Sequence, residues 1–138
     1  MGDLSLLTGS KYLKRLNQTV ERQSFVDADL PINTWVEVLS LTGKHWIDMA
    51  AVRGSNSVTC HAKYEIDGAT SSERQIISQN LKPLIGLAGT NYTDSNIDMD
   101  APSYAKSSFK LFIKRTVATS YGMGMDVRLS QVVVDSME

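Results

Sequence analysis

Apolar and polar residues alternate along residues 58–68 more regularly than anywhere else in the chain. The apolar positions are Val58, Cys60, Ala62, Tyr64 and Ile66. Because a strand sends successive side chains to opposite faces, this pattern predicts a strand with one buried and one solvent-facing side. Asp67-Gly68 follows directly and tolerates positive φ, which predicts a tight turn at the end of the strand.

Five further segments are rich in β-branched and aromatic residues, which favour strands. They are residues 34–41, 45–52, 73–78, 107–119 and 127–134. The short Thr42-Gly43-Lys44 connection predicts that the first two segments form a hairpin. Residues 107–119 also fit a helical period, but their composition favours a strand. About six or seven strands separated by turns predict a mainly β fold, an antiparallel β-sandwich or jelly roll.

The N-terminal part of the chain departs from this pattern. Residues 1–30 contain few apolar residues, although Leu13, Leu16 and Val20 would share one face of a short helix. We predict that residues 1–30 form an arm that packs on its own domain or on a neighbouring subunit, and that residues 31–138 form the β-sandwich domain. A frayed terminus is the alternative for the arm, because a segment with few apolar residues gains little from ordering.

Two other stretches read as connections. Pro83, Gly86 and Gly89 interrupt the apolar residues of the segment 80–102, which predicts a long surface loop containing one short element. Residues 121–126 contain two glycines and predict a flexible turn before the last strand.

Composition restricts the classes of function. The chain has 138 residues, 42% hydrophobic and 21% charged, which is ordinary for one globular domain. A formal net charge of −1 argues against a nucleic-acid partner, because nucleic-acid binders carry strong basic patches. No apolar run reaches the roughly 20 residues of a membrane span, and the N-terminus lacks a signal-peptide pattern. We therefore expect no membrane insertion, and a location in the cytosol or in a particle assembled there.

The only residues that resemble a catalytic set are His45, Asp48, Cys60 and His61. Cys60 is the single cysteine and cannot form an internal disulfide, and its place on the apolar face predicts a small buried hydrophobe. His61 would point to the opposite face of the same strand, so the two cannot form a nucleophile–base pair. A pair between Cys60 and His45 is geometrically open, but no motif selects it. We predict no catalytic residue, no metal and no cofactor.

Oxygen-bearing side chains alternate near the end of the predicted long loop. They belong to Asp94, Asn96, Asp98 and Asp100. Such spacing suits a hard cation, but an EF-hand requires Gly and Glu where Met99 and Ala105 stand. We favour a solvated acidic loop, and a calcium loop outside the EF-hand pattern is the alternative.

Aromatic residues in loops are candidates for ligand contact, because loops commonly carry binding residues. Tyr92, Tyr104 and Tyr121 lie in predicted loops and could stack on the sugars of a host-surface glycan. Packing in the core or against another subunit is the alternative for the aromatic residues of this chain.

The run from Thr34 to Lys44, which contains a Trp, alternating apolar residues and Thr-Gly-Lys, resembles a motif of small virion proteins of tailed bacteriophages. The similarity continues through Ala50-Ala51-Val52, the segment Tyr64–Gly68 and the segment Ser108–Ile113. His45 stands where those proteins carry a small residue. The resemblance implies a β-sandwich associated with the tail or baseplate, often trimeric, and it implies no catalytic residues.

Two predicted strands are apolar on both faces, which indicates that a subunit interface covers them. The residues predicted for this interface are Trp35, Leu39, Leu41, Val132 and Val134. The alternative is that the arm or residues 81–87 cover these strands. We therefore expect a non-catalytic structural protein of a phage or prophage virion, a homo-oligomer with a trimer favoured, in contact with other virion proteins. A carbohydrate- or receptor-binding module is the second hypothesis, and a small hydrolase is the last.

Overall fold

The computed structural model describes residues 11–54, 60–76, 81–86, 99–116 and 123–136, which contain ten strands and one 3-10 helix. The strands are β1 (Lys11–Phe25), β2 (Val36–Thr42), β3 (His45–Arg53), β4 (Cys60–Ile66), β5 (Ala69–Thr70), β6 (Arg74–Ile76), β7 (Lys82–Ile85), β8 (Ser103–Ala105), β9 (Ser108–Arg115) and β10 (Met123–Ser136). The 3-10 helix η1 spans Asp27–Asp29. Within these ranges, no helix has the length and apolar character needed to cross a membrane.

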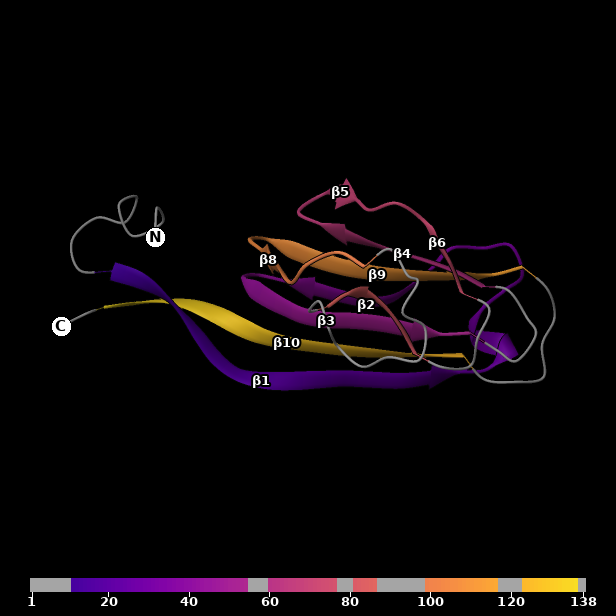
Figure 1. The fold of residues 1–138 in the computed structure, drawn as a ribbon, viewed down its shortest axis with the longest axis horizontal. Helices are drawn as coiled ribbons and strands as arrows, with labels where there is room; N and C mark the ends of the chain where they lie inside the picture. The colour runs from indigo at the N-terminus through magenta and orange to yellow at the C-terminus, as the bar shows by residue number, and fades with distance from the viewer. Residues whose placement is uncertain (1–10, 55–59, 77–80, 87–98, 117–122, 137–138) are drawn as a thin grey trace.

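The strands form two antiparallel sheets that pack against each other (Figure 1). The first sheet has the order β1-β10-β3-β7, with β8 also paired to β3. The second sheet has the order β2-β9-β4-β5, with β6 also paired to β4. The chain passes repeatedly from one sheet to the other, and its first strand lies beside its last, which is a jelly-roll arrangement. The predicted antiparallel β-sandwich is confirmed.

The core lies between the two sheets and follows the period of two that the sequence displays. In β9, Phe109, Leu111 and Ile113 are fully buried, whereas the residues between them are half-exposed. This alternation confirms a strand here and excludes the helical alternative. Cys60 is also fully buried, as predicted, and burial raises the pKa of its thiol to about 12.

The predicted hairpin between residues 34–41 and 45–52 is wrong. β2 pairs with β9 and β3 pairs with β10, so the two strands belong to different sheets. Gly43 reverses the chain with a φ of 96°, and its amide donates to the Ser107 carbonyl at 2.8 Å. The short connection therefore crosses between the sheets, and loop length alone does not distinguish such a crossing from a hairpin.

The N-terminal segment forms a strand and not the short helix that the spacing of its apolar residues suggests. β1 pairs with β10 along its whole length, with a β-bulge between Arg15 and Gln18. Because β1 is an edge strand and most of its side chains are exposed on both faces, no apolar alternation reveals it in the sequence. β10 begins at Met123, so the last four of the six residues predicted as a turn at 121–126 are strand as well.

Part of the predicted surface loop belongs to the core. β7 buries Leu84 and Ile85 to 1% and 0% exposure, although Pro83 stands beside them. Pro83 is compatible with a strand here because β7 is the last strand in the order of its sheet. Residues 87–98 of the predicted loop lie outside the described residues.

The predicted turn at Asp67-Gly68 is present, and the Asp67 side chain also binds the segment that connects β8 to β9. Asp67 and Gly68 have φ values of 51° and 86°. The Asp67 carboxylate accepts hydrogen bonds from the backbone amides of Lys106, Ser107 and Ser108 at 2.9, 2.7 and 3.0 Å. These amides hold the pKa of the Asp67 carboxyl well below its usual range, because they favour the ionised form.

We expect Asp67→Ala to lower the free energy of unfolding at neutral pH, and the difference from the wild type to shrink in acid. The pKa of this carboxyl is depressed by folding, so its contribution is present above the unfolded-state pKa of about 4 and is lost as the pH falls toward the folded-state value. Urea denaturation at about pH 7 and about pH 3 measures the effect. Glu21→Ala, which removes an exposed carboxylate of β1, is the control. An equal loss at both pH values would contradict this account.

Candidate functional site

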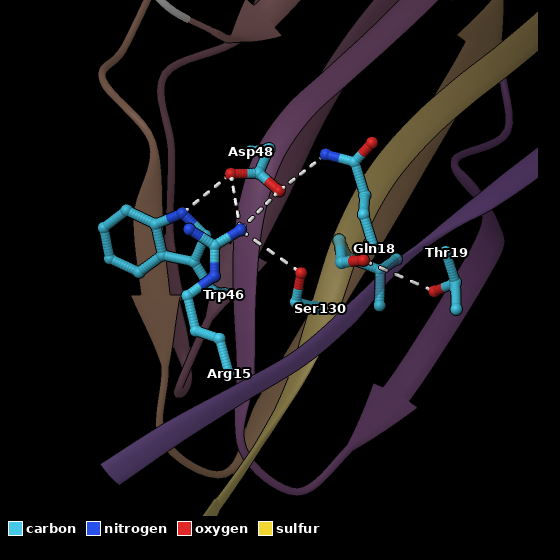
Figure 2. Close-up of polar contacts among 7 residues, drawn as sticks. Arg15, Gln18, Thr19, Trp46, Asp48 and Ser130 are labelled. Atoms are coloured by element: carbon cyan, nitrogen blue, oxygen red, sulfur yellow. Dashed lines mark hydrogen bonds and ion pairs between the residues drawn. The ribbon is translucent and has the colours of Figure 1, made fainter.

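The outer face of the first sheet carries a polar cluster centred on Asp48 of β3 (Figure 2). Ile47 is buried in the core, so its neighbours Trp46 and Asp48 face away from the second sheet. The Asp48 carboxylate accepts hydrogen bonds from Trp46 Nε1 at 2.8 Å and from Arg15 Nη2 at 3.0 Å. Gln18 Nε2 donates a third bond to it at 2.9 Å. Arg15 and Gln18 flank the bulge of β1, so the cluster holds that irregular part of the edge strand.

Arg15 connects three strands of the first sheet. Besides its pair with Asp48, its guanidinium donates to Ser130 Oγ of β10 at 3.2 Å. The guanidinium carbon also lies 5.5 Å from the centroid of the Trp46 ring, within the range of a cation–π contact. The Asp48 carboxylate is thus occupied by one cation and two neutral donors, which suits a structural role and not that of a general base.

Beyond this cluster, β1 and β10 continue as a two-stranded ribbon formed by residues 11–15 and 132–136 (Figure 1). The ladder of β3 with β10 ends at His45 and Gln131, and the Val132 amide donates to the Lys44 carbonyl at 2.9 Å. Beyond Val132, within the described strand ladders, the ribbon residues pair only with each other. A two-stranded ribbon alone is marginally stable in water.

The ribbon and the adjoining part of β1 expose apolar side chains. Leu16, Val20 and Val134 are 40%, 49% and 47% exposed. A groove of about 630 Å³ lies beside them, between the β1–β10 pair and the edge strand β2 of the second sheet. Its lining residues are Lys14, Arg15, Leu16, Asn17, Thr19, Glu21, Leu41, His45, Leu129 and Gln131. This side of the sandwich is open and partly apolar.

The opposite side of the sandwich is closed by a cluster on Asp100. The backbone amide of Asp100 bonds to the Leu84 carbonyl of β7 at 2.8 Å. Its carboxylate accepts hydrogen bonds from the Tyr64 hydroxyl of β4 and from Arg74 Nη2 of β6, the latter at 2.8 Å. Asp100 thus links the two sheets. Of the four residues considered for a calcium loop, it has a structural role. Asp94, Asn96 and Asp98 lie outside the described residues.

The pKa values in this cluster follow from burial and pairing. Burial raises the pKa of Tyr64 to about 12, and the hydrogen bond to Asp100 acts in the same direction. Desolvation also acts to raise the pKa of Asp100, but the bonds from Tyr64 and Arg74 and the charge of Arg74 outweigh it, so that pKa is lowered. Tyr64 therefore stays protonated and Asp100 ionised around neutral pH.

Four of the residues predicted for an oligomer interface lie near the open side. Val134 is 47% exposed on the ribbon, whereas Val132 is buried at 6%. Leu39 and Leu41 are half-buried and pack against the core from β2, and Leu41 also lines the groove. A β-bulge between Glu37 and Leu39 breaks the simple alternation of faces along β2. Whether these residues contact another subunit stays a prediction.

Trp35, the fifth residue predicted for the interface, lies just before β2 at the second sheet. Lys63 Nζ of β4 is 4.2 Å from the centroid of its ring, and Lys114 Nζ of β9 is 4.9 Å from it. Both distances correspond to cation–π contacts. Lys63 Nζ also lies 5.7 Å from the centroid of the Phe112 ring, so two lysines contact two aromatic rings on this face.

Of the three tyrosines predicted to contact a ligand, the structure describes Tyr104. It lies in the short strand β8 opposite Trp46, and not in a loop, and it is half-buried. Tyr92 and Tyr121 lie outside the described residues. Ligand contact by these tyrosines stays a prediction.

The residues considered for catalysis do not come together. Cys60 is in the second sheet, whereas His45 is in the first, where its Nδ1 lies 3.3 Å from the Gly43 carbonyl oxygen. His61 pairs with Glu73 at 2.9 Å. In the described ranges, no group of three or more His, Cys, Asp or Glu side chains is arranged to hold a metal ion.

No family model, no curated protein and no solved structure matches this chain. The function is therefore argued from the geometry of the described residues. The features that distinguish this sandwich are the Asp48 cluster, the projecting ribbon and the groove beside it.

The Asp48 cluster was missed in the sequence. The spacing of Trp46 and Asp48 places both on one face of a strand, and this spacing could have predicted their contact. Their partners Arg15 and Gln18 lie 33 and 30 positions from Asp48, in a segment predicted to be an arm. Only the pairing of β1 with β10 brings them to β3, and no short-range pattern encodes that pairing.

We expect Asp48→Ala to lower the free energy of unfolding by about 1–3 kcal/mol, because it leaves the half-buried Trp46 Nε1 and the Arg15 guanidinium without their acceptor. Asp48→Asn retains the shape but not the charge and should cost less. Urea denaturation measures the loss, and amide hydrogen exchange should show faster opening of β1. Gln75→Ala, at an exposed position of β6 outside the groove, should change stability by no more than about 0.5 kcal/mol. Equal stability of Asp48→Ala and wild type would contradict the structural role of this cluster.

Proposed function

We propose that this chain is a non-catalytic structural protein of a virus particle and that it acts by assembling with copies of itself. The ribbon formed by residues 11–15 and 132–136 carries this proposal, because it extends past the sandwich and its Val134 is 47% exposed. In the adjoining part of β1, Leu16 and Val20 are 40% and 49% exposed. A second copy packed on the ribbon would cover them. The protein would then be located in the virion, after assembly in the cytoplasm of the host.

The architecture and the sequence support this proposal. Jelly rolls recur in viral capsid domains and in lectins, so the strand order is compatible with a role in a particle. Fold alone does not assign function, which lies in particular sites. The resemblance of residues 34–44 to small virion proteins of tailed bacteriophages favours a place in the tail or another part of a phage or prophage particle. It also favours a trimer, and other virion proteins as further partners.

The charges of β1 favour a closed assembly over open-ended pairing of strand edges. β1 carries Lys14, Arg15 and Arg22, which are all exposed, and it contains the bulge after Arg15. Charged side chains and bulges are the features by which natural edge strands avoid uncontrolled β-pairing. We therefore propose that copies meet through side chains of the ribbon and the groove and do not extend the sheet from one molecule into the next.

We expect the wild-type protein to form one oligomer of constant mass over a wide concentration range, and Val134→Glu to shift it toward the monomer. The substitution places a charge on the exposed apolar face of the ribbon, where burial in an interface would be costly. Light scattering on a sizing column measures the mass of both proteins.

Val26→Glu is the matched control for this experiment. Val26 is a valine of 61% exposure that lies outside the ribbon, so its substitution should leave the oligomer intact. A wild-type protein that remains a monomer at every concentration would overturn the proposal. Equal effects of the two substitutions on the oligomer would show that the ribbon is not part of the interface.

A further inference from the structure

Three leucines give the groove beside the ribbon an apolar surface that continues into the core. Leu129 of β10 is 4% exposed and belongs to the core between the sheets, and Leu41 of β2 is half-buried and packs against that core. Leu16 of β1, which is 40% exposed, lines the same groove. The groove of about 630 Å³ is therefore large enough for several side chains, and apolar groups would be favoured in it.

The charged residues that line the groove do not select a charged ligand. Arg15 pairs with Asp48 at 3.0 Å, and Lys14 pairs with Asp135 at 3.6 Å. Glu21 adds one negative charge to a lining whose two cations each have a carboxylate beside them. An uncharged apolar segment matches this lining better than a polyanion or a polycation does.

The chain itself contains such a segment just before β1. Residues 4–7 read Leu-Ser-Leu-Leu and carry no charge, and they lie outside the described residues. The same Leu-Ser-Leu order occurs at residues 39–41, where it forms part of β2. This composition is therefore compatible with an extended segment that presents leucines to a groove.

The ribbon carries residues 4–7 away from the groove of their own copy. Lys11 pairs with Ser136 at the tip of the ribbon, which projects past the rest of the sheet (Figure 1). Leu129 of the groove pairs with Thr19, which lies about 26 Å from Lys11 along an extended strand. If the chain reversed at residues 8–10, residues 4–7 would lie beside residues 11–14 and would stop short of Leu129. The groove of another copy is not subject to this limit.

We propose that residues 4–7 of one copy occupy this groove in a neighbouring copy, with their leucine side chains against Leu16, Leu41 and Leu129. This contact rests on the proposed assembly through the ribbon and identifies the segment that fills the groove. A copy packed on the ribbon lies close to residues 4–7, so the tether gives this segment a high effective concentration at that copy. Each copy donates one segment and receives one, and the assembly closes when every groove is filled.

Replacement of the three leucines tests this contact on the full chain. Leu4→Ser, Leu6→Ser and Leu7→Ser together remove the apolar side chains and keep the length and the charge of the segment. We expect the protein concentration at which half of the oligomer dissociates to rise about tenfold or more, because burial of one leucine side chain is worth about that factor. Light scattering at several protein concentrations measures it, and urea denaturation verifies that the sandwich is folded.

Ser5→Ala combined with Thr8→Ala is the matched control for the triple serine variant. It changes polar positions of the same part of the chain and should leave the dissociation of the oligomer unchanged. A triple serine variant that dissociates like the wild type would overturn the proposal.

Disulfide cross-linking of two co-expressed variants identifies which copy supplies the segment. Leu6→Cys places a thiol in the segment, and Asn17→Cys places one at an exposed position of the groove lining. We expect oxidation to join the two chains in a hybrid that is recognised by its mass. Thr70→Cys, at an exposed position of β5 outside the groove, should give no hybrid with Leu6→Cys. Cys60 is fully buried and stays in every variant.

The cross-links separate this contact from the assembly through the ribbon. Absence of the hybrid in an oligomer that Val134→Glu dissociates would reject this contact and retain the ribbon. A hybrid in an oligomer that Val134→Glu leaves intact would do the reverse. A disulfide within one chain of a Leu6→Cys, Asn17→Cys double variant would overturn the proposal, because the segment would then fill the groove of its own copy. A monomeric wild type would reject both contacts.

Discussion

The pairing of the first strand with the last is the constraint on which the sandwich depends. β10 lies between β1 and β3, and its inward side chains fill the core along the first sheet. Backbone ladder bonds do not by themselves fix β1, which is an edge strand with a bulge and few buried side chains. Two arginines on its outer face form ion pairs with the neighbouring strands. Arg15 pairs with Asp48 and Arg22 pairs with Asp126, with an N–O distance of 3.0 Å in each case. These two charge-assisted contacts between residues far apart in sequence favour the observed register of β1.

The same arrangement makes the two sides of the sandwich unequal. On the side of β7, the Asp100 carboxylate joins the sheets through Tyr64 and Arg74. On the side of β1 and β2, a groove is lined by residues of both edge strands. The β1–β10 ribbon continues past the rest of the sheet (Figure 1). The contacts proposed between copies of the chain use this open side.

Particular elements show which parts of this structure are readable in the sequence. β4 and β9 were predicted because each has one buried face and one face toward solvent. Such a strand requires apolar and polar residues to alternate, and this alternation is visible in the sequence. β1 was not predicted because both of its faces are largely exposed, and an exposed strand does not require apolar and polar residues to alternate. The hairpin assigned to β2 and β3 failed because Gly43 permits a tight turn whether the next strand returns to the same sheet or crosses to the other. The contacts of Gln18 with Asp48 and of Arg53 with Ser24 were not predicted for a related reason, since their members come from segments more than 25 positions apart.

The sequence by itself determined that the chain is a β-sandwich, that Cys60 is a buried hydrophobe and that Asp67-Gly68 is a turn. Each of these depends on a local property, namely the period of two in a half-buried strand or the tolerance of positive φ at one position. Only the tertiary structure decided that β1 closes the first sheet, that Asp48 holds it there, and that Leu41 and Leu129 line one groove. These features depend on strand pairing between distant residues, and its free energy comes from contacts that exist only after the chain has folded.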